Sequence, residues 1–124
     1  MNMVNVNVYT PGADVTAVAT AAVIAKRLVS ISGNRSGDNI AVGPAPAAVR
    51  AFGVAKDDAA VGELVSVARG ASRVVLVRAA GAIAANAEVE VGAAGQVITK
   101  ASGIAVGFAV TGAASGADAQ ISLY

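Results

Sequence analysis

A phrase of alternating large and small side chains occurs twice in this chain. Residues 49–54 read VRAFGV and residues 105–110 read AVGFAV, and each phrase precedes an Ala/Gly/Ser-rich stretch and a short strand-like run. Phe52 and Phe108 stand 56 positions apart, and the following runs keep that offset. Strict alternation is typical of a β-strand whose faces meet different surroundings, and Gly or Ala on one face lets another backbone approach. The repetition predicts two equivalent strand–turn–strand units in one β-domain, with the two phenylalanines in related places.

Short alternating runs recur along the whole chain, separated by Gly, Asn, Ser, Asp and Pro. Such spacing is typical of a β-sandwich or small barrel, so we expect an all-β, single-domain barrel or sandwich with Gly/Ala-rich turns. Residues 16–31 mix helix- and strand-favouring side chains, and we interpret them as two strands with a turn near 25–27. Residues 57–61 are compatible with one helical turn. The expected strands are 15–20, 28–31, 39–42, 49–55, 62–68, 72–79, 88–91, 96–99, 104–110 and 119–124.

The core of this domain must be built almost entirely from aliphatic side chains. Apolar residues make up 56% of the 124 residues, but aromatic residues only 3%. Burying a Val or Leu contributes about 1.5–3 kcal/mol, and an Ala contributes less. A thin aliphatic core gains from association, so the composition favours an oligomer. The residues that we expect in the core are Phe52, Val54, Phe108, Val110, Ile121 and Leu123.

The first ten residues form a segment of their own. Residues 1–9 alternate, with Val4, Val6 and Val8 on one face, and a Pro-Gly turn then separates them from the rest. We therefore expect an N-terminal arm or strand over 1–10 and a β-rich domain over 11–124. The arm either closes the domain's own sheet or reaches a neighbouring molecule, where Val4, Val6, Val8 and Tyr9 would be contact residues.

The residues that carry most enzyme chemistry are missing or badly placed. The chain has no Cys and no His, which removes thiolate metal sites and the commonest general base. Glu88 and Glu90 alternate with valines and are expected on the solvent face of one strand. The Asp57–Asp58 pair is expected to cap a helical turn. We therefore expect no enzyme activity, no cofactor and no metal.

Two further motifs lack the neighbouring elements or geometry that phosphate binding or catalysis requires. The run GAAG at 92–95 joins two short strands and predicts a hairpin, whereas a phosphate-binding loop needs a following helix. Ser102 and Lys100 share a strand face without the geometry of a catalytic dyad. A small-molecule substrate is therefore not expected.

Charge is nearly balanced along the chain. Nine basic and eight acidic residues leave a net charge of +1, without the basic stripe and aromatics of a nucleic-acid binder. No apolar stretch predicts a membrane span, and the N-terminus lacks the pattern of a secretory signal. Arg69, Arg73 and Arg78 flank an apolar strand. They either discourage edge-to-edge aggregation or contact acidic groups on a partner protein.

Six short segments, made largely of Ala, Gly and Val, carry a family resemblance that starts near Pro11. They are RAFGVA at 50–55, AVGELVSV at 60–67, VGAAGQV at 91–97, AVGFAV at 105–110, AASG at 113–116 and QISL at 120–123. On these structural segments the chain resembles the capsid-cement, or head-decoration, proteins of tailed bacteriophages over most of its length.

The resemblance implies a non-enzymatic protein, made in the host cytoplasm, that binds the outside of a mature phage capsid. It implies a homotrimer that bridges neighbouring major capsid subunits and reinforces the shell, with no catalytic residues. Multivalent attachment lets each copy bind with modest affinity. Two alternatives remain open: another structural virion subunit, such as a tail-tube or head–tail connector protein, and a small β-barrel enzyme or carbohydrate-binding domain.

Overall fold

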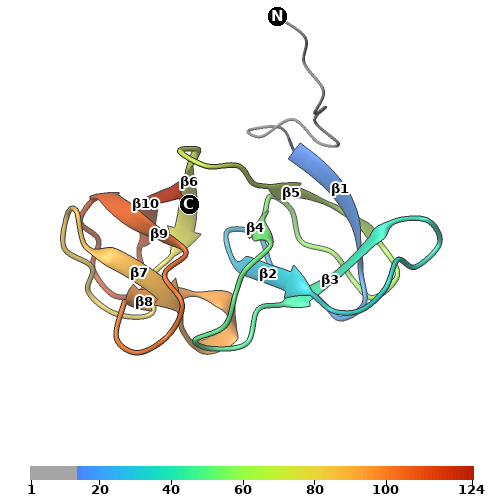
Figure 1. The fold of residues 1–124 in the computed structure, drawn as a ribbon, viewed down its shortest axis with the longest axis horizontal. Coiled ribbons are helices and arrows are strands. Elements are labelled where there is room, and N and C mark those ends of the chain that lie inside the picture. The colour runs from blue at the N-terminus through green and yellow to red at the C-terminus, as the bar shows by residue number, and fades with distance from the viewer. Residues whose placement is uncertain (1–13) are drawn as a thin grey trace, which may run out of the picture.

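A computed structural model describes residues 14–124, which form ten strands and one short 3-10 turn (Figure 1). The predicted all-β fold is confirmed. Among the described residues, no helix is long and apolar enough to cross a membrane. The elements are β1 (Asp14–Ala19), β2 (Leu28–Ile31), β3 (Ile40–Pro44), β4 (Gly53–Ala55), β5 (Leu64–Ala68), β6 (Val74–Arg78), β7 (Glu88–Val91), η1 (Ala93–Gly95), β8 (Val97–Thr99), β9 (Gly107–Thr111) and β10 (Asp118–Leu123).

The first five strands form a closed barrel in the order β1-β3-β2-β4-β5. All of its pairings are antiparallel except β1 with β3, which run parallel from Ala17 opposite Ile40 to Ala19 opposite Val42. The barrel closes when β1 pairs with β5 on its other edge. Full closure leaves none of these five strands as a free edge, which removes a common site of aggregation.

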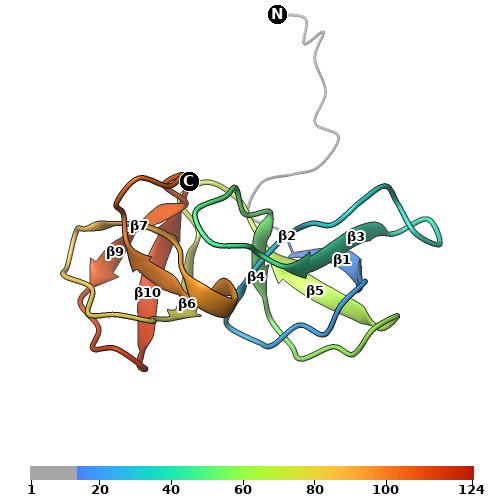
Figure 2. The same cartoon turned by 90° about the horizontal axis from the view of Figure 1, so that it is seen from below.

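The last five strands repeat this arrangement as an open sheet, in the order β6-β10-β9-β7-β8 (Figures 1 and 2). Five residues, 92–96, join β7 to β8, whereas eight, 32–39, join β2 to β3. The strand that follows is also shorter, because β8 has three residues where β3 has five. The equivalent of the parallel pairing between β1 and β3 is a single parallel bridge between Ala79 and Val97.

The repeat is real, but its register differs from the one predicted. A Cβ at Gly53 would collide with the carbonyl oxygen of Ala68, and one at Gly107 with that of Ser122. These glycines are therefore equivalent, which sets the offset at 54 (107 minus 53) in this half of each unit. Phe108 then corresponds to Val54, not to Phe52, so the predicted equivalence of the two phenylalanines is wrong.

The same correspondence extends to the loops. Lys26 and Asn86 both have positive φ, 64° and 68°, and Gly62 and Gly116 have φ of 87° and 84°. The isolated bridge of Val23 with Ala59 reappears as Ile83 with Ala113. The offset is thus 60 before the β7–β8 hairpin (86 minus 26) and 54 after it (116 minus 62), because the second unit is the shorter one.

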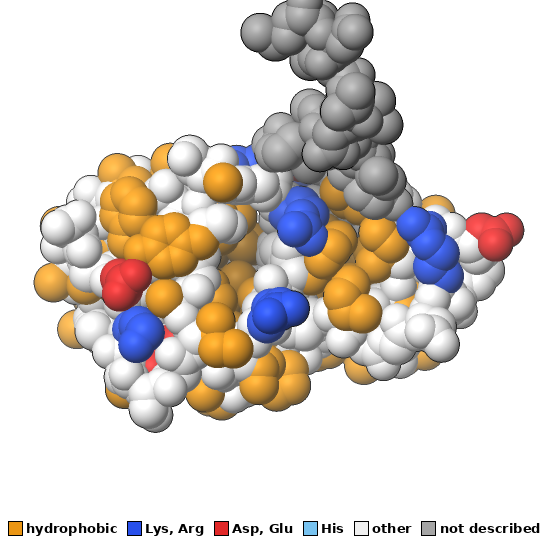
Figure 3. Space-filling view, viewed as in Figure 1, with side chains coloured by type: hydrophobic (Ala, Val, Ile, Leu, Met, Phe, Trp, Pro, Cys, Tyr) orange, Lys and Arg blue, Asp and Glu red, His pale blue; other side chains and the backbone are white. Residues whose placement is uncertain are grey.

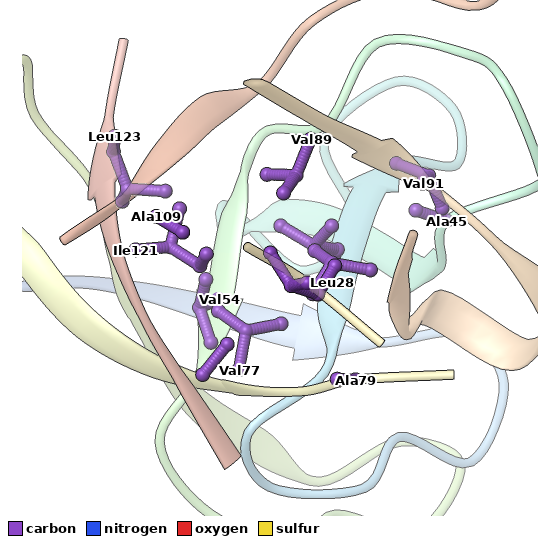
Figure 4. Packing of buried hydrophobic residues seen from close by; sticks show 13 residues of the cluster. Leu28, Ala45, Val54, Val77, Ala79, Val89, Val91, Ala109, Ile121 and Leu123 are labelled. Atoms are coloured by element: carbon purple, nitrogen blue, oxygen red, sulfur yellow. The ribbon is translucent and has the colours of Figure 1, made fainter. Parts of the chain in front are cut away.

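One hydrophobic cluster joins the two units. Leu28 and Val54 of the barrel pack with Val77, Val89 and Ile121 of the open sheet, and each of these five is at most 2% exposed (Figure 4). A second cluster, which includes Val42 and Val67, fills the barrel. The barrel's outer face thus covers the open sheet, which explains why both halves form one small domain.

The predicted strands are present, mostly with shorter ends. The interpretation of residues 16–31 as two strands is confirmed by β1 and β2, and residues 88–91 match β7. The run 49–55 keeps only β4 as strand, at 53–55. The helical turn considered at 57–61 is absent; Asp58 instead accepts a hydrogen bond from the backbone N–H of Ala25 at 2.8 Å.

Candidate functional site

Two adjoining hollows lie on the surface where the barrel meets the open sheet. The larger, about 450 Å³, is lined by both units and includes Phe52, Arg69, Leu123 and Tyr124. The smaller, about 410 Å³, shares Phe52 and Arg69 and adds Arg50. We call the two together the inter-unit groove. Figure 3 shows basic side chains beside apolar ones on the face between the two units.

The groove's apolar floor and basic rim come from residues next to β4 and β5. Phe52 precedes β4 and is half-buried, with its N–H bound to the carbonyl oxygen of Val29 at 2.7 Å. Arg69 follows β5, and its guanidinium carbon lies 4.1 Å from the centre of the Phe52 ring. This stacking holds the cation over the aromatic face while its N–H groups stay available at the edge.

The other two arginines of the predicted interface set are already paired within the chain. Arg73 forms an ion pair with Asp14 at 2.6 Å, and Arg78 forms one with Asp118 at 2.9 Å. Lys26 binds the same Asp118 at 2.8 Å. These contacts connect β6 to the barrel, so an intramolecular role accounts for Arg73 and Arg78, and Arg69 is the member of the set that lines the groove.

Both aspartates in these contacts are stabilised as carboxylates. The hydrogen bond from Lys56, followed by that from Arg73, lowers the pKa of Asp14 below its usual value. The hydrogen bond from Lys26, followed by that from Arg78, lowers the pKa of Asp118 in the same way. A hydrogen bond to the charged form favours that form, so both ion-pair groups are strongest near neutral pH.

The expectation that Glu88 and Glu90 share a solvent face is wrong. Glu88 is exposed and accepts a hydrogen bond from the Tyr124 hydroxyl at 2.6 Å, which raises the pKa of that tyrosine. Glu90 is only 3% exposed and accepts the backbone N–H of Ala101. The loop after β8 folds over Glu90, and a Cβ at Gly103 would collide with this carboxylate. Two carboxylates in such different surroundings form no paired site.

The remaining motifs take structural roles. The GAAG run forms the predicted hairpin, with η1 inside it and no α-helix after it. Lys100 donates to the neighbouring carbonyl of Ala101 at 3.4 Å, and no hydrogen bond joins it to Ser102 among residues 14–124. Within that range no group of three or more metal-binding side chains occurs.

The predicted core residues separate into three environments. Val54, Ile121 and Leu123 are buried, at 2%, 0% and 6% exposure. Phe52 and Phe108 are half-buried; the Phe108 ring lies 6.1 Å from that of Tyr124 at 43°. Val110 is 48% exposed, so its assignment to the core is wrong. Gly107 and Ala109 face the interior in β9, which turns Phe108 and Val110 outward.

The proposed arm, with Val4, Val6, Val8 and Tyr9, lies outside the described residues. Sequence reasoning also missed Arg50 and Tyr124 as neighbours of the groove. The signal that would have found Arg50 is its place two residues before Phe52, on the same side of an alternating run. Tyr124 had no such signal, because only the packing of the two units brings it to Phe52.

The chain is similar to known proteins both in sequence and in fold. A family model described as phage cement protein matches residues 9–123. Among solved structures, the chain is similar to the N base of the head fibre gp8.5 of bacteriophage phi29, with a TM-score of 0.75 and 24% identity over 90% of this chain and 93% of that one. The curated proteins contain no match.

Proposed function

Because this chain belongs to the phage cement protein family, we propose that it binds the outer surface of a mature phage capsid and stabilises it. The family match over residues 9–123 is the observation that carries this proposal. The proposed partner is the major capsid protein, with each copy bridging neighbouring subunits. A protein that binds the mature shell but not a disrupted one stabilises the shell by mass action.

The surface supports a role in association. Within residues 14–124, ten large apolar side chains are substantially exposed, among them Val61 at 69% and Leu64 at 60%. Exposed apolar residues that gather in patches are typical of protein-binding surfaces. We propose a homotrimer, whose mass by light scattering would be three times the 11.9 kDa of one chain.

We also propose residues 1–10 as the arm that attaches the β-domain to its neighbour. The first described residue after this segment is Asp14, which Arg73 and Lys56 hold in place by ion pairs. Any force on the arm is therefore transmitted to both β1 and the start of β6. Val4, Val6, Val8 and Tyr9 would make the contacts by adding a strand to an exposed sheet edge.

Occupancy on purified shells that lack this protein tests the proposal. The full chain should saturate the shells and raise their temperature of disruption, whereas a chain without residues 1–9 should bind more weakly. The matched control replaces Asn5 and Asn7 by Ser and keeps the valines, so it should bind like the full chain. No binding by the full chain would refute the proposed function; equal binding by the truncated chain would refute only the arm.

Copy number separates the cement role from the other structural role considered. A cement protein covers the shell in many copies, whereas a tail-tube or connector subunit is confined to one vertex or the tail. Quantitative mass spectrometry of whole particles, with the major capsid protein as internal standard, measures this ratio. A copy number far below that of the major capsid protein, as expected for a tail or connector subunit, would overturn the capsid assignment.

A further inference from the structure

The inter-unit groove combines an apolar floor with cations that form no ion pair within residues 14–124. Among the described residues, the ion pairs engage Lys26, Lys56, Arg73 and Arg78, and neither Arg50 nor Arg69 is among them. Both of these arginines are exposed. The carboxylate nearest to Arg69 along the barrel, Asp14, lies opposite Ala68 and is held by Lys56 and Arg73 instead. The groove therefore carries local positive charge on a chain whose net charge is only +1.

The internal repeat shows that this combination belongs to one unit alone. Counting from the equivalent glycines, Gly53 and Gly107, the counterparts of Arg50, Phe52 and Arg69 are the aliphatic residues Ile104, Val106 and Leu123. In the second unit Val106 and Leu123 pack on the cluster that the two units share, whereas Arg50 and Arg69 are exposed. Phe52 packs against the barrel's own cluster, but packing does not explain two exposed cations beside it, which points to contact with something outside the chain.

From this arrangement we infer that the groove binds an extended peptide segment in which carboxylates alternate with apolar side chains. The carboxylates would accept hydrogen bonds from Arg50 and Arg69, whose planar groups match a carboxylate in pairs of bonds. The apolar side chains would lie against Phe52, Leu123 and the exposed Ile31, which also borders the smaller hollow. Each hollow falls within the roughly 300–1,000 Å³ of ordinary binding pockets.

The same geometry disfavours a nucleic acid as the occupant. Arg69 covers one face of the Phe52 ring and the ring also packs against the barrel's cluster, so a base has no open face there on which to stack. A phosphate backbone would gain from the arginines but would leave the apolar floor uncovered. The inference rests on the proposed function in one respect: the peptide would be supplied by the capsid.

Peptide titration followed by two-dimensional NMR tests the inference without any capsid. The probe is a capped (Asp-Leu)3 peptide, the control peptide is (Asn-Leu)3, and dT6 represents single-stranded DNA. We expect the acidic peptide to shift amides around residues 50–53 and 69–71, with at least about tenfold higher affinity than the Asn peptide. Equal affinity for both peptides, shifts elsewhere, or tighter binding of dT6 in the groove would each overturn it.

A double variant isolates the two arginines. Arg50→Gln with Arg69→Gln should lower the affinity for (Asp-Leu)3 about tenfold, while Arg35→Gln, in the β2–β3 loop, should not. Thermal unfolding of each variant verifies that it is folded. On shells, the double variant should also lose occupancy. If the full chain binds shells and the double variant binds equally, the groove is not the contact, although the proposed function stands; failure of the full chain to bind would refute the proposed function itself.

Discussion

Two glycines, rather than the two phenylalanines, define how the halves of this chain correspond. Gly53 and Gly107 each sit where a side chain would collide with a carbonyl oxygen of the neighbouring strand, in Ala68 and Ser122. The conspicuous side chains are free to differ because their surroundings differ. Val54 is buried between the units, whereas its counterpart Phe108 lies at the surface beside Tyr124.

Replacing either glycine with alanine should be costly. We expect Gly107→Ala to lower the free energy of unfolding by about 2–4 kcal/mol, because the added methyl group must push β9 from β10. The control is Gly81→Ala, where nothing lies within 4 Å of the new Cβ. Urea denaturation measures both, and equal midpoints for the two variants would contradict the close-approach explanation.

The ion pairs of Asp14 and Asp118 predict acid sensitivity. Both pKa values are lowered in the folded chain, so their stabilisation is complete above the unfolded value of about 3.9 and is lost as pH falls through the folded value. Both side chains are partly exposed, at 37% and 23%, so each contributes less than about 1 kcal/mol.

The thermal unfolding midpoint should therefore decrease as the pH is lowered from about 5 to about 2, and this decrease should be smaller in Asp118→Asn. The control is Asp57→Asn, because Asp57 forms no ion pair within residues 14–124. Thermal melts at each pH give the measurement. A pH profile for Asp118→Asn that matches the unmodified chain would show that this pair contributes nothing to stability.

At the scale of elements, the second unit differs from the first because its sheet stays open. The β7–β8 connection is three residues shorter than the β2–β3 connection, five against eight, and β8 no longer reaches along β6. Residues 73, 75, 77 and 79 direct their backbone groups toward β10, as the bonds Leu123 N–H to Arg73 O and Ala79 N–H to Ala117 O indicate. Val74 and Leu76 therefore direct theirs toward the other edge of β6, which pairs with no strand in the part of the chain that the structure describes.

Hydrogen exchange should show this difference residue by residue. We expect the amides of Val74 and Leu76 to exchange fast and those of Val75 and Val77 slowly, because only the N–H groups of the latter two point toward β10. The alternating residues of one strand thus serve as their own control. Slow exchange at Val74 and Leu76 would show that another strand covers this edge.

For the whole molecule, the shared cluster predicts a single unfolding transition. Leu28 belongs to the barrel but is 1% exposed within the cluster that the open sheet dominates. Leu28→Ala should lower the unfolding free energy by about 2–5 kcal/mol and destabilise both units together. Leu64→Ala, at a leucine that is 60% exposed, is the matched control.

Two probes distinguish joint from separate unfolding. In a Tyr9→Phe background, the fluorescence of Tyr124 reports on the open sheet, while far-UV circular dichroism reports on all strands. The two transitions should coincide in the unmodified chain and in Leu28→Ala. Separate midpoints would mean that the barrel and the open sheet are independent folding units.

The amino-acid sequence by itself determined most of the strands and turns and the presence of an internal repeat, but not the register of that repeat. Alternation with period two and turn residues such as Gly and Asn act over a few neighbouring positions, so β1, β2 and β7 and the GAAG hairpin could be predicted without tertiary knowledge. The resemblance to phage cement proteins followed from the same local segments, and the family match confirms it.

Only the tertiary structure decided which face of each strand is covered, and by what. Glu90 became buried because a loop from beyond β8 folds over it, and Arg73 and Arg78 found partners 59 and 40 positions away (73 minus 14 and 118 minus 78). Leu28 and Glu88 occupy equivalent places in the two units. Leu28 is buried because this face of the barrel packs against the open sheet, whereas Glu88 is exposed because no described segment covers it. Burial depends on contacts between distant segments, which a local pattern does not contain.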